Sequence, residues 1–413
     1  MREMKDSGIE WAGVIPNTWN INKGKYFMEL LTRPTLETDE VITCFRDGEV
    51  TLRSKRREEG FTVSLTEAGY QGIEIGDLVV HGMDGFAGSI GISDSRGKAT
   101  PVLNVLDTEQ NKRYMMYLMR TMAYCELFLS LATGIRVRTC DTNWKKLREI
   151  DYILPTIPEQ KAIADFLDEQ CAEIDSLISD IQSQIEALEE YKRSVITEAV
   201  TKGLDPDVEM RDSGVQWIGM MPTHWDCQRG KYLLRYVQKP VRDDDGVITC
   251  FRDGEVTLRR NRREEGFTMA DKEIGYQGID VGDLVVHGMD GFAGSIGISD
   301  SRGKASPVLN VLDTEQNKRY IMYYLRSMAY NDVFVALATG IRVRSCDLRW
   351  NKLAELLYPM PPVEEQQAIV EHIDSVLERT NAIIADKKQQ IETIEEYKKS
   401  LIFEYVTGKK EVA

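Results

Sequence analysis

The sequence repeats itself at a constant offset of 206 residues, and this repeat constrains the fold more than any other feature. The segment GDLVVHGMDGFAGSIGISDSRGKA stands at residues 76–99 and returns unchanged at 282–305. Segments 41–53 and 247–259 (VITCFRDGEVTLR) are also identical, and no insertion or deletion interrupts the register. Solenoid repeats have periods of roughly 20–50 residues, so a unit this long predicts a duplicated pair of domains. Two like surfaces on one chain are expected to bind a partner that presents something twice.

Composition narrows the class of protein. The length of 413 residues suits about two to four domains, and the 42% hydrophobic content suffices for buried cores. We expect no signal peptide and no membrane span, because the start of the chain lacks an apolar run and no stretch of about 18 apolar residues occurs. The seven cysteines form no CxxC pair, which favours free buried thiols in a reducing cytoplasm. A net charge of −15 means that any DNA-binding surface must rest on local positive clusters.

Each repeat divides into two kinds of segment. The first, about 155 residues long, is rich in glycine and in short β-branched runs, which predict strands at 77–80, 89–92 and 101–106. A helix is expected over 112–131, where apolar residues dominate. This part of each repeat is predicted to be an α+β globule.

The second kind of segment predicts a long helix. It opens with a proline-containing start signal at 155–160, and no further glycine or proline follows until Gly203. Apolar or small residues then alternate at spacings of four and three, which is the coiled-coil period. About 43 residues would extend about 65 Å, and we predict that the two helices pair antiparallel. The alternative is that each helix lies on its own globule. The predicted stripes are Ala164, Leu167, Cys171, Ile174, Ile178, Ile181, Ile185, Leu188, Val195 and Ala199, interrupted by Lys192, and Val370, Ile373, Leu377, Thr380, Ile384, Lys387, Ile391, Ile394, Lys398, Leu401 and Tyr405.

Three repeated motifs resemble the specificity subunits of type I restriction–modification systems, over essentially the whole chain. MKDSGIEW at 4–11, with Pro16 and Trp19, resembles the start of that family's target-recognition domain, and 210–225 repeats it. PTIPEQKAIADFLD at 155–168 resembles the junction into the family's conserved helix and is matched by PPVEEQQAIVEHID. The Gly-Asp-Leu-Val segments also fit the family's pattern.

The resemblance implies an α+β fold in which two duplicated α/β target-recognition domains are separated by two long antiparallel coiled-coil helices with pseudo-twofold symmetry. The expected boundaries are residues 1–155 for the first recognition domain, 156–205 for the first helix, 206–361 for the second domain and 362–413 for the second helix.

The resemblance further implies that each domain reads one half of a split DNA site while the helices set the gap and dock two methyltransferase subunits. S-adenosylmethionine would be held by those subunits and no cofactor by this chain, which would be non-catalytic. A motor–nuclease restriction subunit is a further expected partner. Because the two domains are nearly identical, a twofold arrangement predicts an interrupted, nearly palindromic target.

The candidate DNA-binding residues are cations and histidines in glycine-flanked or turn segments. Arginine can contact guanine or phosphate with two hydrogen bonds, and glycine lets the backbone approach a ligand closely. The alternatives to DNA contact are solvated loops, surface ion pairs and structural histidines. The first repeat supplies Arg46, Arg53, Lys55, Arg56, Arg57, His81, Arg96, Lys98, Arg136 and Arg138. The second supplies Arg252, Arg259, Arg260, Arg262, Arg263, His287, Arg302, Lys304, Arg342 and Arg344.

Two catalytic interpretations are rejected. Residues 91–99 have the wrong glycine spacing for a P-loop and lack its Ser or Thr. The triplet Glu159-Gln160-Lys161 loses its lysine in the second copy and opens a helix, where an acidic residue favours the helix dipole. The remaining alternative functions are a coiled-coil scaffold or decoy that binds methyltransferase subunits without DNA, and a self-contained enzyme.

Overall fold

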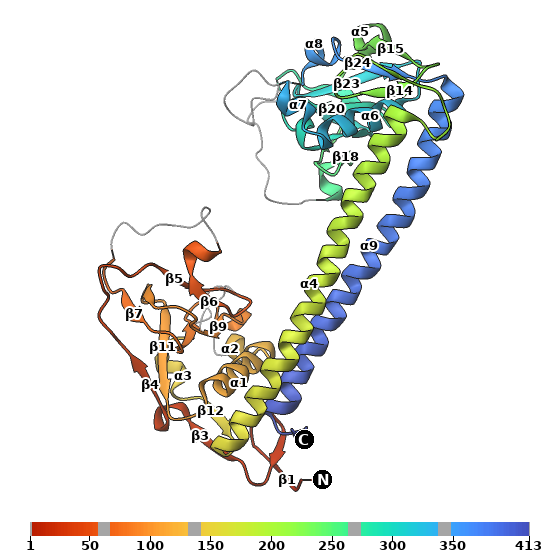
Figure 1. The fold of residues 1–413 in the computed structure, drawn as a ribbon. Coiled ribbons are helices and arrows are strands. Elements are labelled where there is room, and N and C mark those ends of the chain that lie inside the picture. The colour runs from red at the N-terminus through yellow and green to blue at the C-terminus, as the bar shows by residue number, and fades with distance from the viewer. Residues whose placement is uncertain (1, 57–66, 131–141, 263–273, 338–347, 413) are drawn as a thin grey trace. The chain divides into compact units, whose positions relative to one another are not determined.

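The chain forms two compact units, each containing one α+β globule and parts of both long helices. The computed structural model describes residues 2–56, 67–130, 142–262, 274–337 and 348–412 (Figure 1). The first unit comprises residues 1–181 and 388–413, and the second comprises residues 182–387. These units cut across the expected division into four segments, because parts of both helices pack on each globule. The four-segment division therefore stays a prediction.

A four-stranded antiparallel sheet is the centre of the first globule. Its order is β4 (Met28–Leu31), β11 (Leu103–Thr108), β8 (Leu78–His81) and β9 (Ile90–Ile92). Successive side chains of a strand point to opposite faces. Leu78 and Val80 accordingly join the core beneath α1 (Lys112–Tyr124), whereas Val79 joins a second core around Ile42 and Cys44. Burial on both faces explains why this strand reads as a continuous apolar run.

Four antiparallel strand pairs complete the first globule. They are β1 (Met4–Asp6) with β2 (Val14–Pro16), β3 (Asn20–Lys23) with β12 (Asp151–Leu154), β5 (Ile42–Cys44) with β6 (Val50–Leu52), and β7 (Gln71–Ile73) with β10 (Gly97–Ala99). The expected strands at 77–80, 89–92 and 101–106 are present within one or two residues.

The second globule repeats this architecture, as the near identity of the sequences requires. Its sheet runs β16 (Leu234–Tyr236), β23 (Leu309–Thr314), β20 (Leu284–His287) and β21 (Ile296–Ile298). Its pairs are β13 (Met210–Asp212) with β14 (Met220–Pro222), β15 (Asp226–Arg229) with β24 (Leu357–Met360), β17 (Ile248–Cys250) with β18 (Val256–Leu258), and β19 (Gln277–Ile279) with β22 (Gly303–Ala305). Short helices α5 (Gly230–Leu233) and α8 (Trp350–Leu353) accompany them, and α3 (Trp144–Leu147) is the first-copy mate of α8.

The helix expected over 112–131 is shorter than predicted. Asn111 caps α1 by accepting from the backbone N–H groups of residues 113 and 114, but the helix ends at Tyr124. Glu126 then adopts a left-handed φ of 59°, and a separate turn, α2 (Leu127–Ser130), follows. This break turns the chain so that Phe128 enters the core. The second copy breaks in the same way at Asp332, between α6 (Lys318–Tyr330) and α7 (Val333–Ala336).

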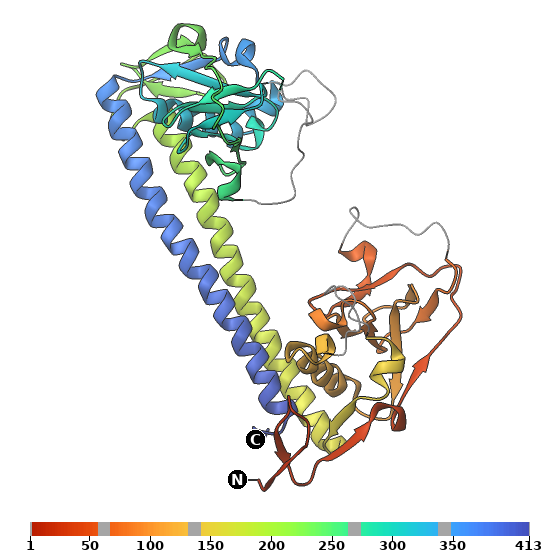
Figure 2. The same ribbon diagram turned by 180° about the vertical axis from the view of Figure 1, so that it is seen from behind.

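The two long helices are confirmed and pair antiparallel. They are α4 (Ile157–Lys202) and α9 (Val363–Val406), which lie side by side within each unit (Figures 1 and 2). In the first unit the rings of Phe166 and Tyr405 are 4.4 Å apart, and Lys398 lies 2.6 Å from Asp175. In the second unit Gln184 accepts a hydrogen bond from Lys387. As the residue number rises along α4, the residue number of the partner on α9 falls, which is the order of an antiparallel pair.

Each globule binds the C-terminal end of the helix that belongs to the other repeat. The buried Tyr114 hydroxyl lies 3.2 Å from the carbonyl oxygen of Val406, and Tyr320 makes the equivalent contact with Val200 at 3.2 Å. The tryptophans of the repeated opening motif share these cores: Trp19 packs in the cluster that contains Val406, and Trp225 in the cluster that contains Val200. The docking of helix ends is therefore reciprocal.

Among the described residues, the cysteines at 44, 125, 171, 227 and 250 are free thiols. Burial raises the pKa of Cys44 and of Cys250 to about 12, so both thiols stay protonated. The expected burial holds for Cys44, Cys171 and Cys250, whereas Cys125 is exposed and Cys227 is half-buried. Over the same part of the chain, no helix is long and apolar enough to cross a membrane.

Candidate nucleic-acid interface

A glycine-containing hairpin carries the first candidate residues. Strands β5 and β6 are joined at residues 45–49, where Gly48 adopts a φ of +87° that only glycine adopts without strain. Arg46 projects from this turn, 63% exposed, and lies 3.0 Å from Asp84. The hairpin thus presents an arginine whose ion pair with Asp84 is partly exposed to solvent.

The basic turn after β6 holds most of its cations in hydrogen bonds or ion pairs. Arg53 begins the 3₁₀ turn η2 (Arg53–Lys55) and donates from Nε to Thr43 Oγ1 at 3.1 Å. The Lys55 ammonium lies 3.2 Å from Asp94 and donates to Ser95 Oγ at 2.8 Å.

Arg56, which follows that turn, contacts both carboxylates of the neighbouring hairpin. Its guanidinium lies 2.7 Å from Asp47 and 2.9 Å from Glu49. It also stacks 4.2 Å from the ring centroid of Phe45. Asp47 and Glu49 thus balance the charge of Arg56, and the hairpin and the basic turn form one surface.

The second repeat reproduces this surface with two substitutions. Arg252 lies 3.3 Å from Asp290, and Arg259 donates to Thr249 at 3.1 Å. Arg262 lies 2.6 Å from Asp253 and 3.0 Å from Glu255, as Arg56 does from its mates. The substitutions place Arg260 and Asn261 where the first repeat has Ser54 and Lys55.

His81 and His287 stabilise the loops that follow them. Nδ1 of His81 accepts the backbone N–H groups of Met83 and Asp84 at 3.2 and 3.0 Å, and His287 does the same in its own loop. Because a backbone N–H can only donate, Nδ1 carries no proton and Nε2 is the protonated nitrogen. Burial lowers the pKa of both histidines, so they are neutral at pH 7. Each histidine offers one Nε2–H donor, which suits a base edge or a phosphate.

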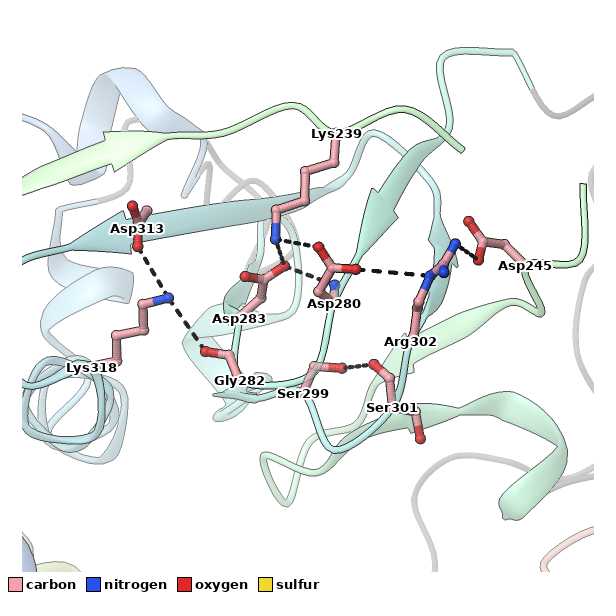
Figure 3. A network of polar contacts seen from close by, with 10 residues as sticks. All are labelled: Lys239, Asp245, Asp280, Gly282, Asp283, Ser299, Ser301, Arg302, Asp313 and Lys318. Atoms are coloured by element: carbon pink, nitrogen blue, oxygen red, sulfur yellow. Dashed lines mark hydrogen bonds and ion pairs between the residues drawn. The ribbon is translucent and has the colours of Figure 1, made fainter. Parts of the chain in front are cut away.

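Arg96 and Arg302 are each held by a buried carboxylate. Arg96 contacts Asp39 at 3.2 Å and also pairs with Glu74. Figure 3 shows the second copy, in which Arg302 lies 3.0 Å from the buried Asp245 and 3.8 Å from Asp280.

Lys239 extends the same network. It contacts Asp280 at 2.8 Å and Asp283 at 2.6 Å (Figure 3). These pairs connect the segment before β17 to the β19–β20 region, so the network has an evident structural role.

Lys98 and Lys304, which occupy equivalent positions in the two repeats, lie on strands. Lys98 belongs to β10 and lies 2.6 Å from Glu67 with only 15% of its side chain exposed. Lys304 occupies the same place on β22, and its backbone N–H donates to Gly246 O at 2.8 Å. A DNA contact by Lys98 requires this ion pair to open. Arg57, Arg136, Arg138, Arg263, Arg342 and Arg344 lie outside the described residues.

Sequence reasoning missed the arginine beneath each hairpin. Arg120 of α1 donates to Gly48 O at 2.9 Å and to Ile90 O at 2.7 Å, and Arg326 makes the same contacts in the second copy. These bonds anchor the turn that carries Arg46. The available signal was a cation in the middle of an apolar helical stretch, repeated in both copies.

The arrangement suits binding of a polyanion. Exposed ion pairs contribute about 0–1 kcal/mol each, so a phosphate can replace a carboxylate at little cost. Within the described part of the chain, no cluster of three or more His, Cys, Asp or Glu side chains could hold a metal ion.

Comparison with known proteins gives two relatives and a solved fold. No family model matches the chain. The MjaVIII type I restriction enzyme specificity subunit of Methanocaldococcus jannaschii is 26% identical over 326 residues, which cover 73% of this chain and 72% of that protein. A second protein of that organism, assigned as the specificity subunit of the type I enzyme MjaX, is 24% identical over 74% of this chain and 71% of its own length.

A solved structure from work on assembly and conformational transition of the type I R-M system matches 96% of this chain and 99% of its own. Its TM-score is 0.67 at 11% identity, which shows a shared fold. A crystal structure of the HsdS subunit from Thermoanaerobacter tengcongensis also aligns, with a TM-score of 0.49 and 11% identity over 98% of this chain. The repeated motifs and the two relatives show that this chain is similar to type I restriction enzyme specificity subunits.

Proposed function

We propose that this chain selects the DNA sequence for a type I adenine methyltransferase and restriction complex and catalyses no reaction itself. Each globule would read one half of a bipartite site with the hairpin, the basic turn and the histidine loop. The observation that carries the proposal is that these three segments are nearly identical in the two repeats. A duplicated surface of exposed cations is the expected counterpart of a duplicated, negatively charged target.

The reciprocal docking of helix ends supports a nearly palindromic target. Tyr114 of the first repeat contacts Val406 of the second, and Tyr320 of the second contacts Val200 of the first. Exchange of equivalent contacts is the pattern that a twofold relation produces. Two like readers related by a twofold axis require an inverted repeat in the DNA. We therefore propose the same short half-site on opposite strands, with a fixed gap.

The long helices are proposed to set that gap and to dock two methyltransferase subunits. α4 and α9 have 46 and 44 residues, so they have nearly equal length. Much of their outer surface is exposed and acidic, notably Glu186, Glu190 and Glu198 on α4. S-adenosylmethionine would be bound by the methyltransferase subunits, and a restriction subunit would join for cleavage.

Modified-base sequencing tests the proposal. DNA would be taken from cells that express this chain with a type I methyltransferase subunit, and from matched cells that lack the chain. We expect N6-methyladenine in an interrupted inverted repeat only when the chain is present. Methylation at an asymmetric site would refute the equivalence of the two readers but keep the function. Absence of methylation while the complex still forms would favour a scaffold that binds methyltransferase subunits without reading DNA.

A further inference from the structure

We propose that the two recognition globules bind DNA unequally, because Arg260 gives the second repeat a phosphate contact that the first repeat lacks. This inference rests on the proposed DNA-binding function and adds a difference between its two halves. It arises from three substitutions on and beside the basic turn: Glu40 to Gly246, Ser54 to Arg260, and Lys55 to Asn261.

In the first repeat these positions neutralise one another and their surroundings. Ser54 Oγ donates to Glu40 Oε2 at 2.8 Å, which brings a carboxylate against the basic turn. Lys55 lies 3.2 Å from Asp94 and donates to Ser95. The one cation among the three substituted positions is therefore already bound to an acidic partner.

In the second repeat the carboxylate of Glu40 has no equivalent, and the cation stands at position 260 instead of at the position that matches Lys55. Gly246 replaces Glu40, so nothing at that position accepts from residue 260. Asn261 instead donates to Thr257 Oγ1 at 2.9 Å. The exposed Arg260 side chain has no hydrogen bond or ion pair with the residues that the structure describes. The three positions carry no net charge in the first repeat and one positive charge in the second.

The backbone holds Arg260 within the candidate surface. It is the middle residue of the 3₁₀ turn η5 (Arg259–Asn261). Arg259 N–H donates to Val247 O at 2.8 Å, and Arg262 N–H donates to Arg259 O at 3.2 Å. Arg262, close by in the chain, is bound by Asp253 and Glu255. Arg260 thus shares the location of the predicted DNA contacts but not their internal partners.

This difference in partners decides which cation gains more from a phosphate. A paired arginine must exchange a carboxylate for the phosphate, so much of its interaction energy is already present in the free protein. An unpaired arginine loses no such partner, and its planar guanidinium fits a phosphate with two hydrogen bonds. The second globule should therefore make one more net phosphate contact than the first.

Salt dependence of binding measures this contact. The probe is a 30-base-pair duplex of random sequence, and the protein is the full chain in complex with a type I methyltransferase subunit. Each phosphate contact contributes about 0.9 to the slope of log affinity against log salt. Arg260→Ser should lower the magnitude of that slope by about one. The affinity ratio between wild type and variant should accordingly shrink by about threefold between 50 and 200 mM salt.

The other repeat and a second arginine supply controls. The triple variant Glu40→Gly/Ser54→Arg/Lys55→Asn gives the first repeat the charges of the second at these three positions and should raise the slope by about one. Arg235→Ser removes the same charge from β16, where Arg235 is 65% exposed and 2.9 Å from Asp313, and should leave the slope unchanged. Arg260→Lys should retain most of the slope because it retains the charge.

The outcomes separate this inference from the function on which it rests. Binding by wild type with an unchanged slope in Arg260→Ser would overturn the inference alone. Equal effects of Arg260→Ser and Arg235→Ser would also overturn it, because the cause would then be total charge. A wild-type complex that binds no DNA at all would overturn the proposed function, and the inference with it.

Discussion

Replacing Tyr114 or Tyr320 by phenylalanine should weaken the docking of the exchanged helix ends. The Tyr114 hydroxyl lies 3.0 Å from Ile153 O and 3.2 Å from Val406 O, and Tyr320 lies 2.9 Å from Pro359 O and 3.2 Å from Val200 O. Both tyrosines are fully buried. Each hydroxyl therefore provides one donor to two buried carbonyl groups that water does not reach.

The expected loss is about 1–2 kcal/mol in each unit. A buried hydrogen bond contributes about 0.5–1.5 kcal/mol net, and leaving an acceptor unsatisfied adds to that cost. With a urea dependence of about 2 kcal/mol per molar, the unfolding midpoint should fall by roughly 0.5–1 M. Because each tyrosine contacts only its own unit, the free-energy changes of the double variant should be the sum of the single ones.

Urea unfolding followed by circular dichroism measures the effect. Tyr26→Phe and Tyr232→Phe are matched controls, since these side chains are 74% and 76% exposed, and should leave the midpoint unchanged. If Tyr114→Phe and Tyr320→Phe behave like these controls, the hydroxyl groups do not stabilise the docking, which would then depend on apolar packing alone.

Four further outcomes are expected. Gly91→Ala should destabilise the first globule by about 3 kcal/mol in thermal unfolding, because the added Cβ would lie 1.9 Å from Gly48 O. The control Gly76→Ala meets open space and should cost about 1 kcal/mol, through the positive φ of that residue alone. Burial raises the pKa of tyrosines such as Tyr114. Their contribution to stability is therefore complete below the unfolded-state pKa of 10.0 and should be lost above that pH, at about 1.4 kcal/mol per tyrosine and pH unit. A free energy of unfolding that stays constant from pH 9 to 11 would contradict this. Replacing Arg56 and Arg57 by alanine should weaken specific DNA binding by about 1–3 kcal/mol in a gel-shift titration if either reads a base, and unchanged affinity and site choice would refute that assignment. Inserting one heptad into both long helices should widen the gap in the methylated site by about three base pairs, from about 10.5 Å of added helix; altered half-sites at an unchanged gap would disprove the spacer role.

Much of the architecture could be predicted from the sequence because it depends on short-range periodicity and on the repeat. The stripe of spacing four and three predicted α4 and α9, and their bounds of 157–202 and 363–406 fall inside the predicted segments. The alternating burial of Leu78, Val79 and Val80 follows from the period of two in any strand. The expected helix over 112–131 was wrong in extent, because a single left-handed residue, Glu126, redirects the chain and the sequence has no glycine there to signal it.

The candidate site was less accessible to sequence reasoning, because the state of a cation depends on partners far along the chain. Arg96 and Arg302 were expected as phosphate contacts, but they bind carboxylates brought to them by other strands. Conversely, Arg120 appeared to be part of an apolar helix, although it anchors the hairpin turn through Gly48 O. The assignment of individual residues to DNA contacts stays a prediction.

The sequence by itself determined the duplication, the two kinds of segment and the types of residue that could bind DNA, since these follow from local pattern and from identity between the copies. Only the tertiary structure decided which cations are already neutralised. Ser54 and Arg260 occupy equivalent turns, yet the first donates to Glu40 and the second has no such partner, because Gly246 stands where that carboxylate would be. The physical reason is that an ion pair requires two groups within about 4 Å, and folding alone determines which distant side chains meet that condition.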